Sequence, residues 1–143
     1  MDKNSYLMYG IYVKSTRATP YAQAIIQGYK TLETRTRDVF KSLFKNQDEI
    51  CVAIIETSGK RSAILGLCIL HKGQKIDCET FRSDEYFHKH LVPPHSKYDV
   101  KDSGFKWCYE CTEPLPFLRP AELPRDIISH GRSYCEFALD DLR

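Results

Sequence analysis

The sequence contains no uninterrupted apolar run of the roughly 20 residues that a membrane-spanning helix requires. Its first ten residues, MDKNSYLMYG, lack the hydrophobic core of a secretory signal, so we expect a cytoplasmic protein with no membrane partner. Internal repeats and low-complexity segments are also missing. Hydrophobic residues make up 42% of the chain and charged residues 28%, which is ordinary for a globular protein. We therefore expect a single domain that spans residues 1–143.

An excess of charge is also lacking, because the formal net charge is only +2. The segment from Lys14 to Lys45 nevertheless holds seven basic and two acidic residues, a local +5 that leaves −3 for the rest of the chain. The low overall charge argues against a protein that coats long duplexes. A local basic mouth for a short anionic ligand fits the distribution better. The alternative is a basic face that is merely solvated.

The six cysteines show no pattern typical of a disulfide framework or a zinc site. Without a secretion signal, we expect reduced thiols. One C-x-x-C pair, Cys108 and Cys111, has no second pair at matching spacing, and in a strand its side chains point to opposite faces. His88, His90 and His95 form a loose group that we interpret as solvated loop histidines. We expect neither a metal nor a cofactor, while a cysteine–histidine nucleophile pair stays open.

Two apolar runs of strand length indicate the centre of a sheet. Ile50–Thr57 and Ala63–Leu70 are separated by the turn signal Ser58-Gly59-Lys60, which predicts an antiparallel hairpin. Gly66 interrupts the second run and suggests a bend or bulge. Together with the segments below, these runs predict a small α+β fold, mostly β, in which five to seven short strands form a barrel with one or two short helices.

Three further segments are predicted to be strands, and a fourth is predicted not to be a central strand. Tyr6–Val13 is rich in aromatic and branched residues, Phe105–Thr112 alternates, and Tyr134–Leu139 supplies a last short run. Pro114–Pro124 contains four prolines, which excludes a central strand.

Helix signals occur at three places. Thr19 is the expected cap of a first helix, which ends at Gly28. Asp38 is the expected cap of a second, short helix that contains Val39, Phe40, Leu43 and Phe44. Ser83 is the expected cap of a third helix, which Pro93-Pro94 ends.

The charged motif of the chain follows the first of these helices directly. Lys30–Arg35, KTLETR, is a short threonine-rich strand pattern. Alternation puts Glu33 and Arg35 on one face with Thr31, and the long side chain of Lys30 at the turn can still reach Glu33.

The stretch from Pro20 to Arg35, PYAQAIIQGYKTLETR, resembles the signature of the ASCH domain family. That family is similar to the PUA domains, small β-barrels that bind RNA, so the resemblance implies a PUA-like β-barrel. Some small ASCH proteins are amidohydrolases that act on modified cytidine and use a lysine at the position matching Lys30. In those proteins a threonine often stands at the position matching Glu33, and a separate glutamate further along the chain assists the lysine. Glu79 and Glu85 are the nearest candidates for that second glutamate in this sequence.

Five residues are our candidates for the site. Lys30 beside an apolar helix can act as base or nucleophile, and Glu33 can carry a proton or accept a hydrogen bond from an exocyclic amine. Arg35 suits a phosphate, and Arg17 before the helix start can bracket the same phosphate. Tyr21 is a possible stacking platform for a base, whereas Trp107 is expected in the core. The alternative is a salt-bridged rim of Lys30, Glu33 and Arg35.

The sequence therefore leaves three functions open. The first is binding of RNA or of a nucleotide-sized ligand in a cleft at the motif, with Arg17, Tyr21, Lys30, Glu33 and Arg35 as ligand-binding residues. The second is a small hydrolase in the same cleft, acting on an acylated cytidine or as a ribonuclease, with Lys30 and Glu33 as catalytic residues. The third is a protein-interaction module that uses its surface otherwise.

Overall fold

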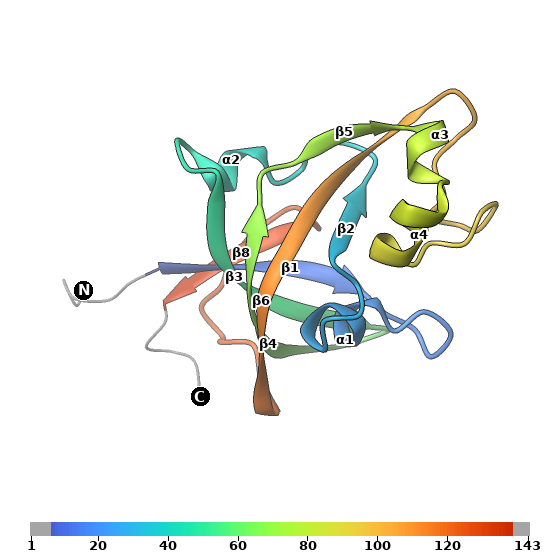
Figure 1. Ribbon diagram of the computed structural model, residues 1–143. Helices are drawn as coiled ribbons and strands as arrows, with labels where there is room; N and C mark the ends of the chain where they lie inside the picture. Colours follow the sequence, from blue (N-terminus) through green and yellow to red (C-terminus); the bar gives the residue numbers. More distant parts are fainter. Residues whose placement is uncertain (1–6, 139–143) are drawn as a thin grey trace.

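The computed structural model describes residues 7–138, which fold into a strongly curved sheet with short helices at its ends (Figure 1). In chain order the elements are β1 (Leu7–Lys14), α1 (Tyr21–Ile26), β2 (Leu32–Arg35), α2 (Lys41–Phe44), β3 (Glu49–Ser58), β4 (Arg61–His71), β5 (Gln74–Asp77), α3 (Cys78–Phe81), α4 (Asp84–His90), β6 (Phe105–Ala121), β7 (Ile128–His130) and β8 (Tyr134–Ala138). Tyr6 and Leu139, expected at strand ends, lie outside the described residues.

The eight strands form one mixed sheet in the order β2-β6-β4-β3-β1-β8-β7, with β5 paired to β6. Only β1 and β3 run parallel, and the other pairs are antiparallel. The α+β, mostly β class is as predicted. Within residues 7–138 the pairing runs from β2 to β7 without joining these two strands, so the sheet is open, and four short helices flank it instead of one or two.

The central hairpin of β3 and β4 confirms the prediction from the two apolar runs. Ile54 pairs with Gly66 and Ile55 with Ile64, so Leu65 is the extra residue of a bulge beside the glycine. A side chain at Gly66 would bring its Cβ to 2.3 Å from the carbonyl oxygen of Leu115 on β6. The glycine is thus required where the backbones of β4 and β6 approach closely.

Gly66→Ala is therefore expected to lower the free energy of unfolding by about 2 kcal/mol. Gly10→Ala is the matched control, because its Cβ would meet the end of the Ile55 side chain, at 2.5 Å, instead of backbone. Since a side-chain end shifts more easily than a strand, we expect a smaller loss there. Urea denaturation of both variants measures the difference, and equal losses would contradict a backbone clash.

The long strand β6 includes most of the proline-rich segment. It continues through Pro114, Pro116 and Pro120, with Pro116 opposite Gly66 of β4. Residues 105–110 lie between β2 and β5, whereas residues 111–121 pair only with β4. The prolines are tolerated because they lie on an edge, where a missing N–H breaks no ladder. The expectation that they exclude a central strand is therefore consistent with the structure.

Two of the three expected helix caps are wrong. At α1, the hydroxyl of Ser15 accepts from the backbone N–H of Ala22 at 2.9 Å, while the hydroxyl of Thr19 pairs with that of Thr16. Asp38 does not cap α2, because its carboxylate accepts a hydrogen bond from the hydroxyl of Tyr109 at 2.7 Å. At α1 a neighbouring residue of the same connection takes the capping role, whereas at α2 a tertiary contact with β6 replaces the local one.

The remaining helix signals are confirmed. Ser83 caps α4 by accepting from the backbone N–H of Tyr86 at 3.3 Å. Gly28 follows α1 with a positive φ of 86°, as a glycine stop requires.

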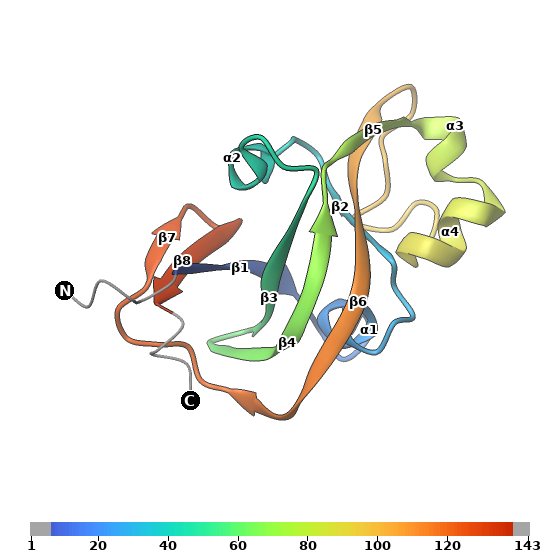
Figure 2. The same cartoon turned by 60° about the vertical axis from the view of Figure 1, so that its left-hand side comes forward.

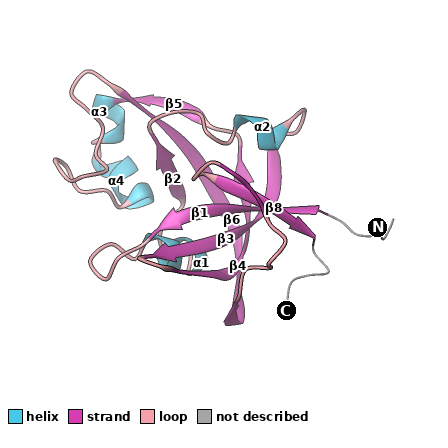
Figure 3. Cartoon of the chain, turned by 180° about the vertical axis from the view of Figure 1, so that it is seen from behind, coloured by secondary structure: helices cyan, strands magenta, loops and turns pink. Residues whose placement is uncertain are grey.

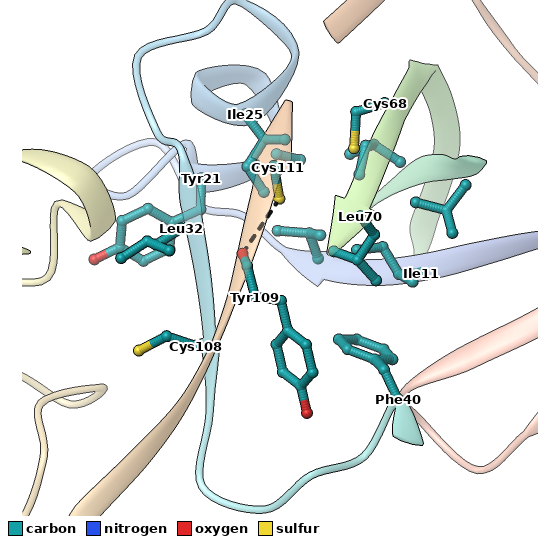
Figure 4. Close-up of a cluster of buried hydrophobic side chains, with 14 of the residues drawn as sticks. Ile11, Tyr21, Ile25, Leu32, Phe40, Cys68, Leu70, Cys108, Tyr109 and Cys111 are labelled. Atoms are coloured by element: carbon teal, nitrogen blue, oxygen red, sulfur yellow. Dashed lines mark hydrogen bonds between the residues drawn. The ribbon is translucent and has the colours of Figure 1, made fainter. Parts of the chain in front are cut away.

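The core fills the inside of the curved sheet around α1, which packs against β1, β3, β4 and β6 (Figure 2). Figure 4 shows Tyr109 and Phe40 near one another, and their ring centroids are 4.9 Å apart in an edge-on arrangement. Cys108 and Cys111 lie on opposite sides of β6, which agrees with the rejection of a shared metal (Figure 4). Trp107 packs partly buried against the core, as predicted.

The helices α3 and α4 form a separate layer on the outside of the sheet (Figure 3). α4 contacts β2, and α3 contacts β5 and β6. The loop that follows α4, residues 91–104, returns to the start of β6 beside the strand that carries the charged motif. None of the helices in residues 7–138 has both the length and the apolar composition for crossing a membrane.

Candidate functional site

A cleft of about 530 Å³ opens beside the charged motif. Its walls come from β1, α1, β2, the loop after α4 and the turn between β7 and β8. This volume lies within the range of about 300–1,000 Å³ that is typical of small-molecule sites. Four of the five candidate residues line it: Tyr21, Lys30, Glu33 and Arg35.

Lys30 lies at the floor of this cleft with only 1% of its surface exposed. The chain reverses at Gly28, and the backbone N–H groups of Tyr29 and Lys30 both donate to the carbonyl oxygen of Ala24. The Lys30 ammonium donates to the carbonyl oxygen of His90 at 2.5 Å. It also lies 4.7 Å from the ring centre of Tyr21. The chain reversal at Gly28, which ends α1, thus directs the Lys30 side chain into the floor of the cleft.

Glu33 is the partner of Lys30, as the spacing predicted. The distance from Lys30 Nζ to Glu33 Oε1 is 3.8 Å. Glu33 Oε2 accepts from Arg35 Nη2 at 3.0 Å, and Oε1 accepts from the backbone N–H of Thr34 at 3.1 Å. Glu33 is 6% exposed, so this charged triad lies on the floor of the cleft and does not form a solvated rim.

Burial and charge act against each other in this triad. Burial lowers the pKa of Lys30, and the negative charge of Glu33 opposes this shift without reversing it. Burial alone would raise the pKa of Glu33, but the charges of Arg35 and Lys30 and the hydrogen bonds from Arg35 and Thr34 hold that pKa below its usual value. Glu33 is therefore ionised at neutral pH, and Lys30 gives up its proton more readily than an exposed lysine.

Arg35 joins the floor of the cleft to β1. Its Nη2 donates to the carbonyl oxygen of Tyr12 at 2.5 Å as well as to Glu33. The guanidinium lies 4.8 Å from the ring centre of Phe40. Both of its hydrogen bonds within the described part of the chain use Nη2, so Nε and Nη1 remain available to a ligand.

The two aromatic walls come from Tyr21 and Tyr98. Their rings meet edge to face, with centroids 6.2 Å apart, and the hydroxyl of Tyr21 donates to the carbonyl oxygen of Leu91 at 3.4 Å. Burial, followed by the charge of Glu33, raises the pKa of Tyr21.

Three candidate residues lie elsewhere. Arg17 is exposed and is not among the residues that line the cleft, so the structure does not form the expected pair with Arg35. Glu79 and Glu85 are exposed on α3 and α4, away from the cleft. Among the described residues, Glu33 is the only carboxylate in the lining.

Sequence reasoning missed the residues that complete the cleft from distant segments. Lys97 and Tyr98 arrive on the loop after α4, and Ser129 and Arg132 arrive beside the turn between β7 and β8. The antiparallel pairing of β1 with β8 brings the latter two next to Lys14. Lysine and arginine in polar loops carry no local signal, so only the tertiary structure reveals them: the fold-back of the loop after α4 for Lys97, and the pairing of β1 with β8 for Arg132.

A second ion cluster holds the loop that carries Lys97 and Tyr98. Arg82 donates from Nε to Asp99 Oδ2 at 3.1 Å, from Nη1 to Asp102 Oδ1 at 2.7 Å, and from Nη2 to the carbonyl oxygen of Val100 at 2.8 Å. Asp99 also accepts from the backbone N–H of His95 at 2.7 Å. This cluster organises the loop from behind, outside the cleft.

His90 differs from the solvated histidine that was expected. It is buried and stacks on Phe81 with ring centroids 3.9 Å apart. Its Nδ1 accepts from the backbone N–H of Val92, and its Nε2 donates to the carbonyl oxygen of Phe81. Burial lowers its pKa, so the ring is neutral. Across residues 7–138, no three histidine, cysteine or carboxylate side chains gather as they would around a metal ion.

Comparison with solved structures assigns the fold. The ASCH protein of Zymomonas mobilis superposes with a TM-score of 0.66 at 18% identity, over 92% of this chain and 90% of that one. The chain has an ASCH-like fold. A serine-to-alanine mutant of the same protein gives a TM-score of 0.65 at 16% identity over the same shares, and a tyrosine-to-phenylalanine mutant gives 0.59 at 20% over 80% and 76%. No protein-family model and no curated protein matches the sequence.

Proposed function

We propose that the ASCH-like domain binds a nucleotide in this cleft, either free or as one residue of a single-stranded RNA. The observation that carries the proposal is the charge of the lining. Five basic side chains face the cleft against one carboxylate: Lys14, Lys30, Arg35, Lys97 and Arg132 against Glu33. A cleft whose lining has an excess of positive charge attracts an anionic ligand and raises the local concentration of that ligand.

The lining also separates into a charged mouth and an enclosed interior. Lys14, Lys97 and Arg132 are exposed, whereas Lys30 is buried. A phosphate fits the exposed mouth because it keeps part of its hydration there. The base fits the interior beside Tyr21 and Tyr98, since nucleotide sites commonly use aromatic side chains against bases.

Calorimetric titration with nucleoside monophosphates and a short single-stranded RNA tests this proposal. Lys97→Ala is expected to weaken the binding of the nucleoside monophosphates and of the RNA by up to about fivefold. Lys101→Ala, an exposed lysine on the same loop that does not line the cleft, is the matched control and should leave binding unchanged. RNA affinity should fall with salt by a slope of about −0.7 for each phosphate contacted. Absence of binding to every probe would contradict the proposal.

A second candidate function rests on the depressed pKa of Lys30 beside an ionised Glu33. In its neutral form Lys30 can take a proton from a water molecule that attacks the amide carbon of an acylated cytidine. The carbon–nitrogen bond then breaks, the proton passes to the leaving nitrogen, and a carboxylic acid and cytidine result. Glu33 stabilises the ammonium while it holds the proton. Phosphodiester hydrolysis of RNA would use the same base.

Turnover of acylated cytidine and of short RNA separates these candidates, with Lys30→Ala beside the wild type. Turnover that the variant lacks makes the protein a hydrolase. Binding without turnover supports recognition alone. If neither appears, a protein-interaction module is the better account.

A further inference from the structure

From the hydrogen-bond inventory of the cleft floor we infer that the site selects bases with a carbonyl edge, such as uracil or hypoxanthine, over bases with an amino edge, such as cytosine or adenine. This inference rests on the proposed function, because it concerns which nucleotide the cleft accepts. It reverses the role expected for Glu33 from the sequence, where the carboxylate was to accept a hydrogen bond from an exocyclic amine.

The one carboxylate of the floor is already engaged by several donors. Glu33 is the single carboxylate that faces the cleft in the described part of the chain, and both of its oxygens have partners. Thr34 donates to Oε1 at 3.1 Å, with Lys30 Nζ 3.8 Å from the same atom, and Arg35 donates to Oε2 at 3.0 Å. A carboxylate has about four lone pairs, so these three groups leave at most one open, and an incoming amine would have to share Glu33 with the cations that already hold it.

Donors remain free on the same floor. The Lys30 ammonium carries three hydrogens, of which one goes to His90 and one faces Glu33. Arg35 uses only Nη2 for its hydrogen bonds within residues 7–138. A carbonyl oxygen accepts from such cations, whereas an amino group would place its own hydrogens against theirs.

The direction in which a nucleotide enters follows from the position of the charges. Lys14, Lys97 and Arg132 hold the phosphate at the exposed mouth, so the base is the part that reaches the buried floor. Two pairs of nucleotides isolate the edge that would meet Lys30. UMP and CMP differ at position 4, oxygen against amine, and IMP and AMP differ in the same way at position 6; in each pair the adjacent ring nitrogen also changes, from N–H in UMP and IMP to an acceptor in CMP and AMP.

The test is calorimetric titration of the wild-type protein with these four nucleotides at one salt concentration. We expect UMP to bind at least about tenfold more tightly than CMP, or IMP than AMP, the usual scale of such discrimination. Equal affinities within both pairs would overturn the inference and leave the proposed function intact. Tighter binding of CMP and AMP would overturn it and restore the amino-edge role of Glu33. No binding of any of the four would overturn the inference, and it would overturn the proposed function as well if the short single-stranded RNA also failed to bind.

Two variants assign the selectivity to the floor. Lys30→Met should bring the ratio between UMP and CMP close to one, mainly by weakening UMP. Lys97→Ala should weaken both nucleotides and leave the ratio unchanged, because Lys97 lies at the mouth. A ratio that survives Lys30→Met would contradict the assignment to Lys30, and thermal melting of each variant checks that it is folded.

Discussion

Glu33→Leu is expected to lower the free energy of unfolding by about 3 kcal/mol at pH 7, the lower end of the range for breaking a buried ion pair from one side. The variant leaves the Lys30 ammonium, which is 1% exposed, without its carboxylate partner. Arg35 loses the same partner but is partly exposed and retains Tyr12. Lys30 carries most of the loss because it is far less exposed than Arg35, at 1% against 20%. Urea denaturation measures the change.

Two further variants show whether charge is the cause. The double variant Lys30→Met with Glu33→Leu should recover most of the loss, since apolar side chains of similar size replace a buried pair at little net change. Glu110→Leu, on the neighbouring strand and 60% exposed, is the control and should change stability little. A single variant as stable as the wild type would show that the triad contributes nothing to the fold.

The same triad gives the stability of the protein a pH dependence of known sign. Because the pKa of folded Glu33 lies below its ordinary value of 4.5, its contribution is complete above that pH and is lost as the pH falls through the lower folded value. The folded pKa of Lys30 is also depressed, so its ammonium opposes folding at neutral pH, and this opposition fades as the pH rises toward 10.5. Glu33→Gln, which cannot titrate, should remove the part of the acid dependence that comes from Glu33, and should lower the pKa of Lys30 further because the opposing negative charge is gone.

Arg82→Met is expected to weaken nucleotide binding by about tenfold while the domain stays folded. Arg82 does not line the cleft, but its contacts with Asp99 and Asp102 organise the loop that presents Lys97 and Tyr98. A loop that adopts its binding conformation in only a tenth of the molecules lowers the apparent affinity by about the same factor. Hydrogen exchange should show faster exchange in residues 95–100, measured beside the affinity.

The control for this variant is Arg119→Met, the same replacement at an exposed position of β6 outside the cleft. It should leave both affinity and exchange unchanged. Arg82→Lys should restore part of the affinity, because an ammonium keeps the charge but cannot form the three-way contact. Unchanged affinity in Arg82→Met would show that the loop is held by other contacts.

The sequence predicts well what local interactions decide. The order Gly28, Lys30, Glu33, Arg35 suffices for a helix stop, an inward lysine and an ion pair, because these residues are neighbours in the chain. It predicts less well what distant segments decide. Asp38 is a good cap by local rules, yet the hydroxyl of Tyr109 on β6 engages it. Thr19 is engaged by its neighbour Thr16, so that error is a local one.

The same distinction explains the prolines and the mouth of the cleft. A proline-rich segment has the composition of a loop, and only the edge position beside β4 makes it a strand. Lys97 and Arg132 belong to the site because a loop folds back and because β8 pairs with β1. Composition and periodicity contain neither of these contacts.

The position of β1 between β3 and β8 has a consequence for synthesis of the protein. β1 is synthesised first, but one of its edges stays unpaired until residues 134–138 of β8 have been made. The lining of the cleft includes both Lys14 from β1 and Arg132, which precedes β8. Pairing over such a separation in the chain is slow to form. A ribosome-bound chain that stops before β8 therefore carries the whole charged motif but only part of the cleft lining, so the proposed ligand recognition would begin only after the last strand has been made.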